Sequence, residues 1–231
     1  MVMRRKRRKS SSRKGRKGKY RRVGYYGRYN RPQRRGELKF FDLLATNAAV
    51  DSTWEVMEDS IHHIAQGTGE SERVGRRIIL TKILLRYTFS LKSIQNQGPG
   101  ATSGGDTVRI VVYWDKQANG ATATGAQLFV DTDELNTYRN MANNRRFKIL
   151  MDRFVSLNPQ SISENTDNLF SAQRNIAHGQ WFKSCRIPIE FSSTTGAMAE
   201  IASNNIGIMA IAEQNQRSEL KYYFRCRYKD M

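Results

Sequence analysis

The sequence has few cysteines and no long apolar segment. Only two cysteines occur among 231 residues, and two cysteines cannot form a disulfide framework or a zinc site by themselves. We therefore expect folding in an intracellular compartment. The longest apolar stretch lies within residues 206–212, far below the roughly 18 residues of a membrane span, so no membrane insertion is predicted. No apolar segment follows the basic N-terminal residues, and a secretory signal is not predicted either.

Catalytic motifs are also lacking. The three histidines are His62, His63 and His178, and adjacent residues of a strand point to opposite sides, so His62 and His63 are not expected to act as paired metal ligands. The segment 67–71 lacks the Gly-Lys-Ser/Thr of a phosphate loop and predicts a turn. Asp115 has no spaced second carboxylate of the kind that a metal nuclease needs. We predict a protein that is not an enzyme and that has no metal or other cofactor.

Acidic residues are absent from the first 36 positions, which hold 17 Lys and Arg. Of the 39 basic and 21 acidic residues in the chain, 39 − 17 = 22 basic and all 21 acidic ones fall in residues 37–231. Like-charge repulsion and the shortage of apolar residues predict that residues 1–36 form a disordered arm. Residues 37–231 are nearly neutral and are predicted to fold as one domain.

The arm has the composition of a nucleic-acid-binding segment. From Tyr20 onward, tyrosines alternate with arginines; guanidinium groups neutralise phosphates and tyrosine rings stack on unpaired bases. A solvated charge run that only keeps the protein soluble is the alternative, which 17 uncompensated cations disfavour. The same cations fit a nuclear localisation signal read by host nuclear import receptors. The predicted nucleic-acid-binding residues of the arm are Arg4, Arg5, Lys6, Arg7, Arg8, Lys9, Arg13, Lys14, Arg16, Lys17, Lys19, Tyr20, Arg21, Arg22, Tyr25, Tyr26, Arg28, Tyr29, Arg31, Arg34 and Arg35.

Apolar and polar residues alternate with period two through much of residues 37–231, which predicts half-buried β-strands. In the first strong segment, the pattern places Ile79, Thr81 and the later odd positions on one apolar face. In the segment 147–151 the same pattern places Phe147, Ile149 and Met151 on one face. The strong segments are 79–91, 107–114, 147–151, 181–191, 206–210 and 220–228, and the weaker ones are 37–47 and 54–64.

About eight strands joined by long, irregular loops favour an all-β fold, a single eight-stranded jelly-roll sandwich. One short helix is expected in 131–143, because Asp131-x-x-Glu134 resembles a capping box. Pro188 interrupts a strand and lacks the N–H of the ladder, so that strand should be an edge or carry a bulge. In a jelly roll with sheets B-I-D-G and C-H-E-F, residues 180–191 fall at strand G, an edge.

Cysteine and tryptophan residues fit the interior of this fold. Cys185 and Cys226 each fall on an apolar strand face, where a free cysteine behaves as a small hydrophobe. Both are predicted to be buried thiols and not a disulfide. The tryptophans are predicted to be core or interface anchors: Trp54, Trp114 and Trp181.

Three segments, taken in order, carry a resemblance to a known group. They contain Arg73-Val-Gly75-Arg-Arg77 at a strand entry, Val111-Val-Tyr113-Trp-Asp115 at a strand end, and Arg145-Arg-Phe147-Lys-Ile-Leu150 at a strand start. With the basic arm, this layout resembles the capsid proteins of circular, Rep-encoding single-stranded DNA viruses, the circovirus and geminivirus-like group. The arm is shorter than in geminiviruses and no Cys/His zinc cluster occurs, so the chain is not assigned to that family.

The resemblance implies a jelly-roll subunit that self-assembles into a sixty-subunit, T=1 icosahedral shell. Its partners would be the circular single-stranded DNA genome, other copies of itself, host nuclear import receptors and an unknown cell-surface receptor. Its locations would be the virion and, during assembly, the host nucleus. The last strand would lie centrally in the sheet of the inner wall and would add basic residues there: Lys221, Arg225, Arg227 and Lys229. A non-capsid protein that binds single-stranded nucleic acid is the alternative.

Overall fold

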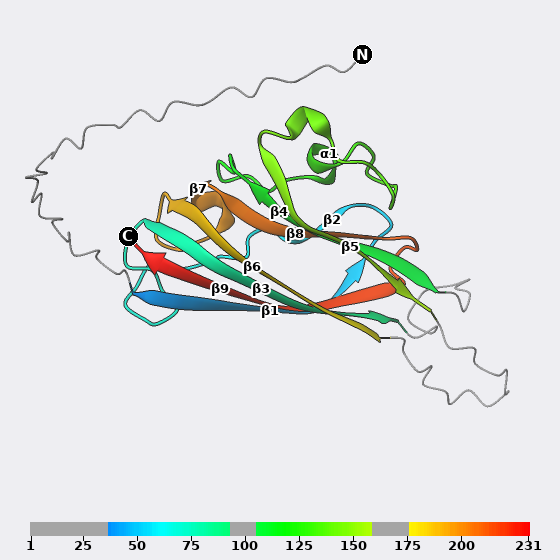
Figure 1. Ribbon diagram of the computed structural model, residues 1–231, viewed down its shortest axis with the longest axis horizontal. Helices are drawn as coiled ribbons and strands as arrows, with labels where there is room; N and C mark the ends of the chain where they lie inside the picture. The colour runs from blue at the N-terminus through cyan, green and yellow to red at the C-terminus, as the bar shows by residue number, and fades with distance from the viewer. Residues whose placement is uncertain (1–36, 93–104, 159–175) are drawn as a thin grey trace, which may run out of the picture. The chain divides into compact units, whose positions relative to one another are not determined.

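Two antiparallel sheets form the part of the chain that the computed structural model describes, residues 37–92, 105–158 and 176–231 (Figure 1). The predicted arm lies outside these residues. One sheet has the order β1 (Leu38–Val50), β9 (Ser218–Asp230), β3 (Arg77–Leu91), β6 (Ile176–Phe191), β7 (Ile201–Ser203). The other has the order β2 (Glu55–Glu58), β8 (Asn205–Ala212), β4 (Asp106–Asp115), β5 (Phe147–Leu157). The predicted all-β class is confirmed, and each predicted segment contains a strand; the short strand β7 was not predicted.

The main core lies between the two sheets, as alternation predicts. Strand β9 buries every second side chain from Leu220 to Tyr228 and exposes those in between. These residues pack with the inward side of β4, which includes Val108, Ile110 and Val112. Both cysteines are free thiols, as predicted, but only Cys226 is buried; Cys185 is half-buried, so the prediction of burial holds for one of the two. Trp114 and Trp181 pack partly buried against the same core.

A bulge in β3 corrects the predicted face of that strand. The pairing of β3 with β9 shifts between Leu80 and Lys82, so Thr81 is an extra residue on β3. Its hydroxyl donates to the Arg227 carbonyl at 2.9 Å. Before the bulge the even positions Ile78 and Leu80 are buried, and after it the odd positions are buried. The prediction that Ile79 and Thr81 share the apolar face was therefore wrong, because alternation changes phase at a bulge.

A second bulge corrects the predicted face of β5. The pairing with β4 shifts so that Met151 lies opposite Val112 and Ile149 opposite Tyr113, which leaves Leu150 as the extra residue. Met151 points into the main core, whereas Phe147 and Ile149 pack in a separate cluster on the other side of the sheet. These three residues do not share a face, contrary to the prediction.

Strand β6 is an edge over most of its length, as Pro188 predicted. Its pairing with β3 also contains a bulge, between Ser184 and Ile187. Only Glu190 and Phe191 reach the short strand β7 on the other side.

The expected strand 54–64 is shorter than predicted. Strand β2 ends at Glu58, and the following residues form a turn and loop. The backbone N–H of Ile61 donates to the Ile206 carbonyl at 2.9 Å, and the N–H of His62 lies 3.3 Å from the Ser60 hydroxyl. His62 and His63 therefore lie in a loop and not on opposite sides of a strand.

Residues 116–146 cover the outer side of the four-stranded sheet. They supply part of a second apolar cluster in which the Trp54 ring stacks on Phe129, with centroids 3.9 Å apart. This cluster buries the outward residues of β4, Val111 and Tyr113. Figure 1 shows the segment beside β4 and β5, across the molecule from β1.

The helix of this segment is not where the capping box predicted it. The helical turn α1 spans Gly125–Leu128, and the N–H of Thr124 donates to Gln127 Oε1 at 3.2 Å. A 3-10 turn covers Met141–Asn143. Residues 131–138 are irregular, since burial of apolar side chains on the sheet outweighs a local capping preference. No helix of the described residues is both long enough and apolar enough to span a membrane.

Candidate nucleic-acid interface

The outward side of the five-stranded sheet is a basic face centred on β9. The side chains of β9 that point away from the core are exposed from Lys221 to Lys229. They include the four basic residues predicted from the sequence, Lys221, Arg225, Arg227 and Lys229. The prediction that they share one polar face of a central strand is confirmed by the strand order. Their binding to nucleic acid stays a prediction.

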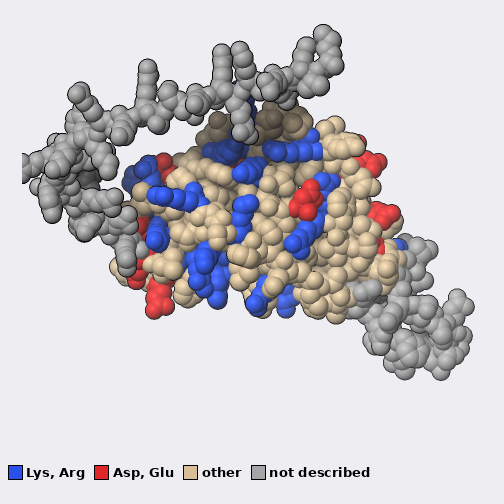
Figure 2. Space-filling view, in the orientation of Figure 1, with Lys and Arg blue, Asp and Glu red and all other residues tan. Residues whose placement is uncertain are grey.

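Neighbouring strands extend this face with more cations. Register pairing places Lys82 of β3 opposite Arg227, and Arg86 opposite Tyr223. Arg186 of β6 is exposed on the same side. Like charges directly opposite each other destabilise a sheet. The repulsion between Lys82 and Arg227 therefore lowers the stability of the folded sheet, and an anionic partner bound between them would relieve it. Figure 2 shows Lys and Arg spread over the face that Figure 1 presents, with Asp and Glu mainly toward its margins.

Two acidic residues of the face are bound by arginines. Asp42 of β1 binds Arg225 through two hydrogen bonds, from Nε at 2.6 Å and from Nη2 at 2.5 Å. Glu190 of β6 accepts from Arg77 at 3.2 Å. The hydrogen bonds to Asp42 raise the pKa of Arg225. Within the described ranges Lys82, Arg86 and Arg227 have no carboxylate partner, so no described acidic residue neutralises their charge.

Exposed aromatic rings lie among these cations. Phe40 of β1, Phe182 of β6 and Tyr223 of β9 are 43%, 70% and 54% exposed. The Arg225 guanidinium lies 5.4 Å from the Phe40 ring centroid. A shallow pocket of about 280 Å³ opens between β1, β9 and β3, lined by Asp42, Leu84, Arg86, Tyr223, Phe224 and Arg225. Cations next to accessible ring faces are what unpaired bases and their phosphates bind.

The sequence analysis identified interface residues on only one strand of this face, β9. The arm residues lie outside the described residues, and their role stays a prediction. The residues missed on neighbouring strands are Phe40, Lys82, Arg86, Phe182 and Arg186. The signal that could have found them is the polar side of the strands adjacent to β9 in a jelly roll, read with the phase change at Thr81.

A hydroxyl and an imidazole meet on the same sheet face. Thr88 Oγ1 lies 2.9 Å from His178 Nδ1, and both residues are solvent-accessible. A nucleophilic triad needs a third group that orients the imidazole. In the described part of the chain no carboxylate contacts His178, so this pair lacks the third group.

Three side chains that could hold a metal meet where β2 ends. Glu58, Asp59 and His63 have ligand atoms that all lie within 4.8 Å of one another. His63 Nε2 is 3.3 Å from Glu58 Oε1 and 2.9 Å from Asp59 Oδ1. The hydrogen bond to Glu58 and the charges of the two carboxylates raise the pKa of His63, against the effect of burial. The sequence analysis missed this group, although an Asp and a His four residues apart were visible in it.

Strand order alone defines the class of this protein: a jelly-roll sandwich whose sheets read B-I-D-G, with β7 as a short addition, and C-H-E-F. No family model matches the chain, and no curated protein matches it either. Among solved structures, the chain is similar to a 60-mer BFDV capsid protein in a crystal structure. The sequence identity is 9%, the match covers 84% of this chain and 93% of that chain, and the TM-score is 0.30.

Proposed function

We propose that this protein is a viral capsid subunit that self-assembles and packages circular single-stranded DNA. The observation that carries the proposal is the outward face of the five-stranded sheet, where exposed Lys and Arg alternate with exposed aromatic rings. A jelly roll with one strongly basic sheet face suits a shell wall whose inner side lies against nucleic acid.

The arm and this sheet face would act together on the genome. The arm carries 17 cations, and the chain that follows it enters the edge of the same sheet at Leu38. Phosphates bound by both would release their counterions, which favours binding of any sequence. The arm cations would also serve nuclear import, and the shell would be of the T=1 type with sixty subunits. The protein would then be found in the virion and in the host nucleus, with a cell-surface receptor that recognises the outer loops.

A non-capsid protein that binds single-stranded nucleic acid is the second candidate. The basic and aromatic face supports it as well, since nothing about that face requires a shell. The two candidates differ in what the protein does once nucleic acid has been removed.

Negative-stain electron microscopy of the full chain distinguishes them. The protein is purified with nuclease in high salt and then returned to low salt, with and without a circular single-stranded DNA. Uniform particles or pentamers are expected of a capsid subunit. A monomer under every condition, which still binds the DNA, would overturn the capsid proposal and favour the second candidate.

A further inference from the structure

We propose that Glu58, Asp59 and His63 form a binding site for one divalent transition-metal cation, of the Zn²⁺ or Mn²⁺ type. The site lies at the end of β2, away from the basic sheet face, and the proposal does not depend on the proposed function. The side chains of Glu58, Asp59 and His63 are 15%, 37% and 30% exposed, so an ion has access from solvent.

The three ligand atoms are already spaced for a common ion. His63 Nε2 lies 3.3 Å from Glu58 Oε1 and 2.9 Å from Asp59 Oδ1. Ligands that share an ion at about 2.0–2.2 Å lie roughly 3 Å apart, because they occupy neighbouring corners of its coordination polyhedron. An ion therefore fits among these atoms with small side-chain movements and no change of the backbone.

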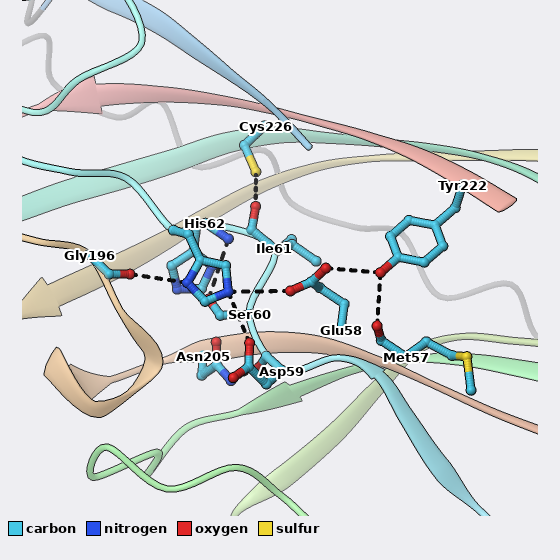
Figure 3. Close-up of polar contacts among 11 residues, drawn as sticks. Met57, Glu58, Asp59, Ser60, Ile61, His62, Gly196, Asn205, Tyr222 and Cys226 are labelled. Atoms are coloured by element: carbon cyan, nitrogen blue, oxygen red, sulfur yellow. Dashed lines mark hydrogen bonds and ion pairs between the residues drawn. The ribbon is translucent and has the colours of Figure 1, made fainter. Parts of the chain in front are cut away.

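A second set of contacts orients the ligands, as in metal sites generally. The other ring nitrogen of His63, Nδ1, lies 3.3 Å from the Gly196 carbonyl. A carbonyl only accepts, so Nδ1 donates to it. Nε2 faces two carboxylates, which also only accept, and it donates to them while no ion is bound. A cation would take the place of that one proton and bind the Nε2 lone pair. The hydroxyl of Tyr222 donates to Glu58 Oε2 at 2.9 Å and leaves Oε1 for the ion (Figure 3).

Unpartnered buried atoms beside the cluster point to a missing polar ligand. Asn205 is fully buried and donates from Nδ2 to the backbone carbonyl of Asp59 at 2.6 Å. Its Oδ1 has no hydrogen-bond partner among the described residues. Figure 3 shows this side chain directly beside the Asp59 carboxylate. Both ring nitrogens of His62, also fully buried, lack a partner in the same part of the chain. Buried polar atoms are rarely left unpaired, and water bound to a cation would supply a donor to Asn205.

The donor set selects the metal. One imidazole nitrogen and two carboxylate oxygens suit Zn²⁺ or Mn²⁺, whereas Ca²⁺ and Mg²⁺ prefer sites made of oxygen alone. A bound ion would connect the two sheets, because its ligands lie at the last residue of β2 in one sheet and just after it, while Tyr222 of the other sheet holds Glu58.

The test measures metal content and thermal stability of the full chain, prepared without a histidine tag and stripped with a chelator. After equilibrium dialysis against micromolar ZnCl₂ or MnCl₂, elemental analysis should find one ion per chain, and the melting temperature should rise. Under the same conditions CaCl₂ should leave both quantities unchanged. His63→Ala and Glu58→Gln should lose the ion and the rise in melting temperature. His178→Ala is the matched control and should keep both.

Folding of each variant is checked by circular dichroism, and Asp59→Asn serves as a third variant if His63→Ala does not fold. The proposal is overturned if folded wild-type protein retains no ion at micromolar concentration. It is equally overturned if Glu58→Gln and Asp59→Asn retain as much metal as the wild type.

Discussion

The guanidinium of Arg146 donates two parallel hydrogen bonds to the carboxylate of Asp115. Nε donates to Oδ1 at 2.9 Å and Nη2 donates to Oδ2 at 2.7 Å, and the side chain of Asp115 is 1% exposed. The hydrogen bond to Asp115 raises the pKa of Arg146. Asp115 ends β4 and Arg146 directly precedes β5. The pair therefore clamps the two ends of the covering segment 116–146 together.

Replacement of Asp115 by Asn should lower the free energy of unfolding by about 1.5–3 kcal/mol, the usual worth of hydrogen bonds to a charged group. Asn keeps the shape but leaves the Arg146 guanidinium without its counter-ion. Urea denaturation of the full chain measures the loss. The control is Glu190→Gln, which breaks the exposed pair with Arg77 and should cost less than about 1 kcal/mol. Equal losses in the two variants would show that burial of Asp115 adds nothing.

Removal of residues 1–36 should leave a folded β-protein, because every strand of the structure begins at or after Leu38. The variant should keep a β-type circular dichroism spectrum and a cooperative thermal transition. It should lose DNA binding and nuclear accumulation together, since the same 17 cations would serve both. A variant that aggregates or melts without cooperativity would contradict the prediction that the arm and the domain are independent.

Replacement of Tyr223 by Ala should weaken binding of single-stranded DNA by at least about fivefold, because stacking contributes roughly 1–3 kcal/mol per base. Binding of a short oligothymidine to the full chain is measured in high salt, where phosphate contacts are screened. Tyr138→Ala is the matched control: Tyr138 is 85% exposed, but it lies in the segment that covers the other sheet. If both variants bind like the wild type, the pocket beside Tyr223 does not hold a base.

Both cysteines should resist thiol reagents in the native protein. Burial raises the pKa of Cys185 to about 11, against the effect of Lys183, and burial raises the pKa of Cys226 as well. At pH 8 about 0.1% of Cys185 would be thiolate, against roughly a quarter of a free cysteine, so labelling should be about two orders of magnitude slower. The rate should rise about tenfold per pH unit up to the pKa. In denaturant both thiols should react like free cysteine; rapid labelling of the native protein would place Cys185 at the surface.

Particles, if they form as proposed, should contain on the order of 1–3 thousand nucleotides of single-stranded DNA. Sixty arms would bring about a thousand positive charges, and the four basic residues of β9 would add up to about 240. Packaged nucleic acid usually exceeds the fixed positive charge, because mobile counterions balance the rest. The length and nuclease sensitivity of extracted nucleic acid check this. Double-stranded DNA, or only a few hundred nucleotides, would contradict the charge-matching argument.

Alternation was enough to predict the six strong strand segments and the exposed face of β9, because a half-buried strand repeats every two residues wherever it is regular. It failed at Thr81 and at Leu150, where one extra residue reverses the sides of the strand. A bulge leaves little trace in a single sequence, since the residue it adds can be of almost any type.

The covering segment and the group of Glu58, Asp59 and His63 could not be predicted from the sequence, for a different reason. Trp54 and Phe129 are far apart in the sequence and meet only because residues 116–146 fold back over β4. Likewise, Asp59 and His63 are neighbours in the sequence, but Gly196 and Tyr222, which orient the group, come from distant segments. Contacts of this kind depend on the tertiary fold and on no local pattern.

The covering segment also makes the two outer sides of the sandwich different from each other. Residues 116–146 and their apolar cluster cover the outer side of one sheet, while no other described segment covers the charged outer side of the other. A sandwich with two similar outer sides could join an assembly with either side facing inward, and only contacts with neighbouring subunits could select one orientation. Here the two sides differ within the single chain. If copies assemble as proposed, this difference would fix which side of each subunit faces inward without any contact between subunits.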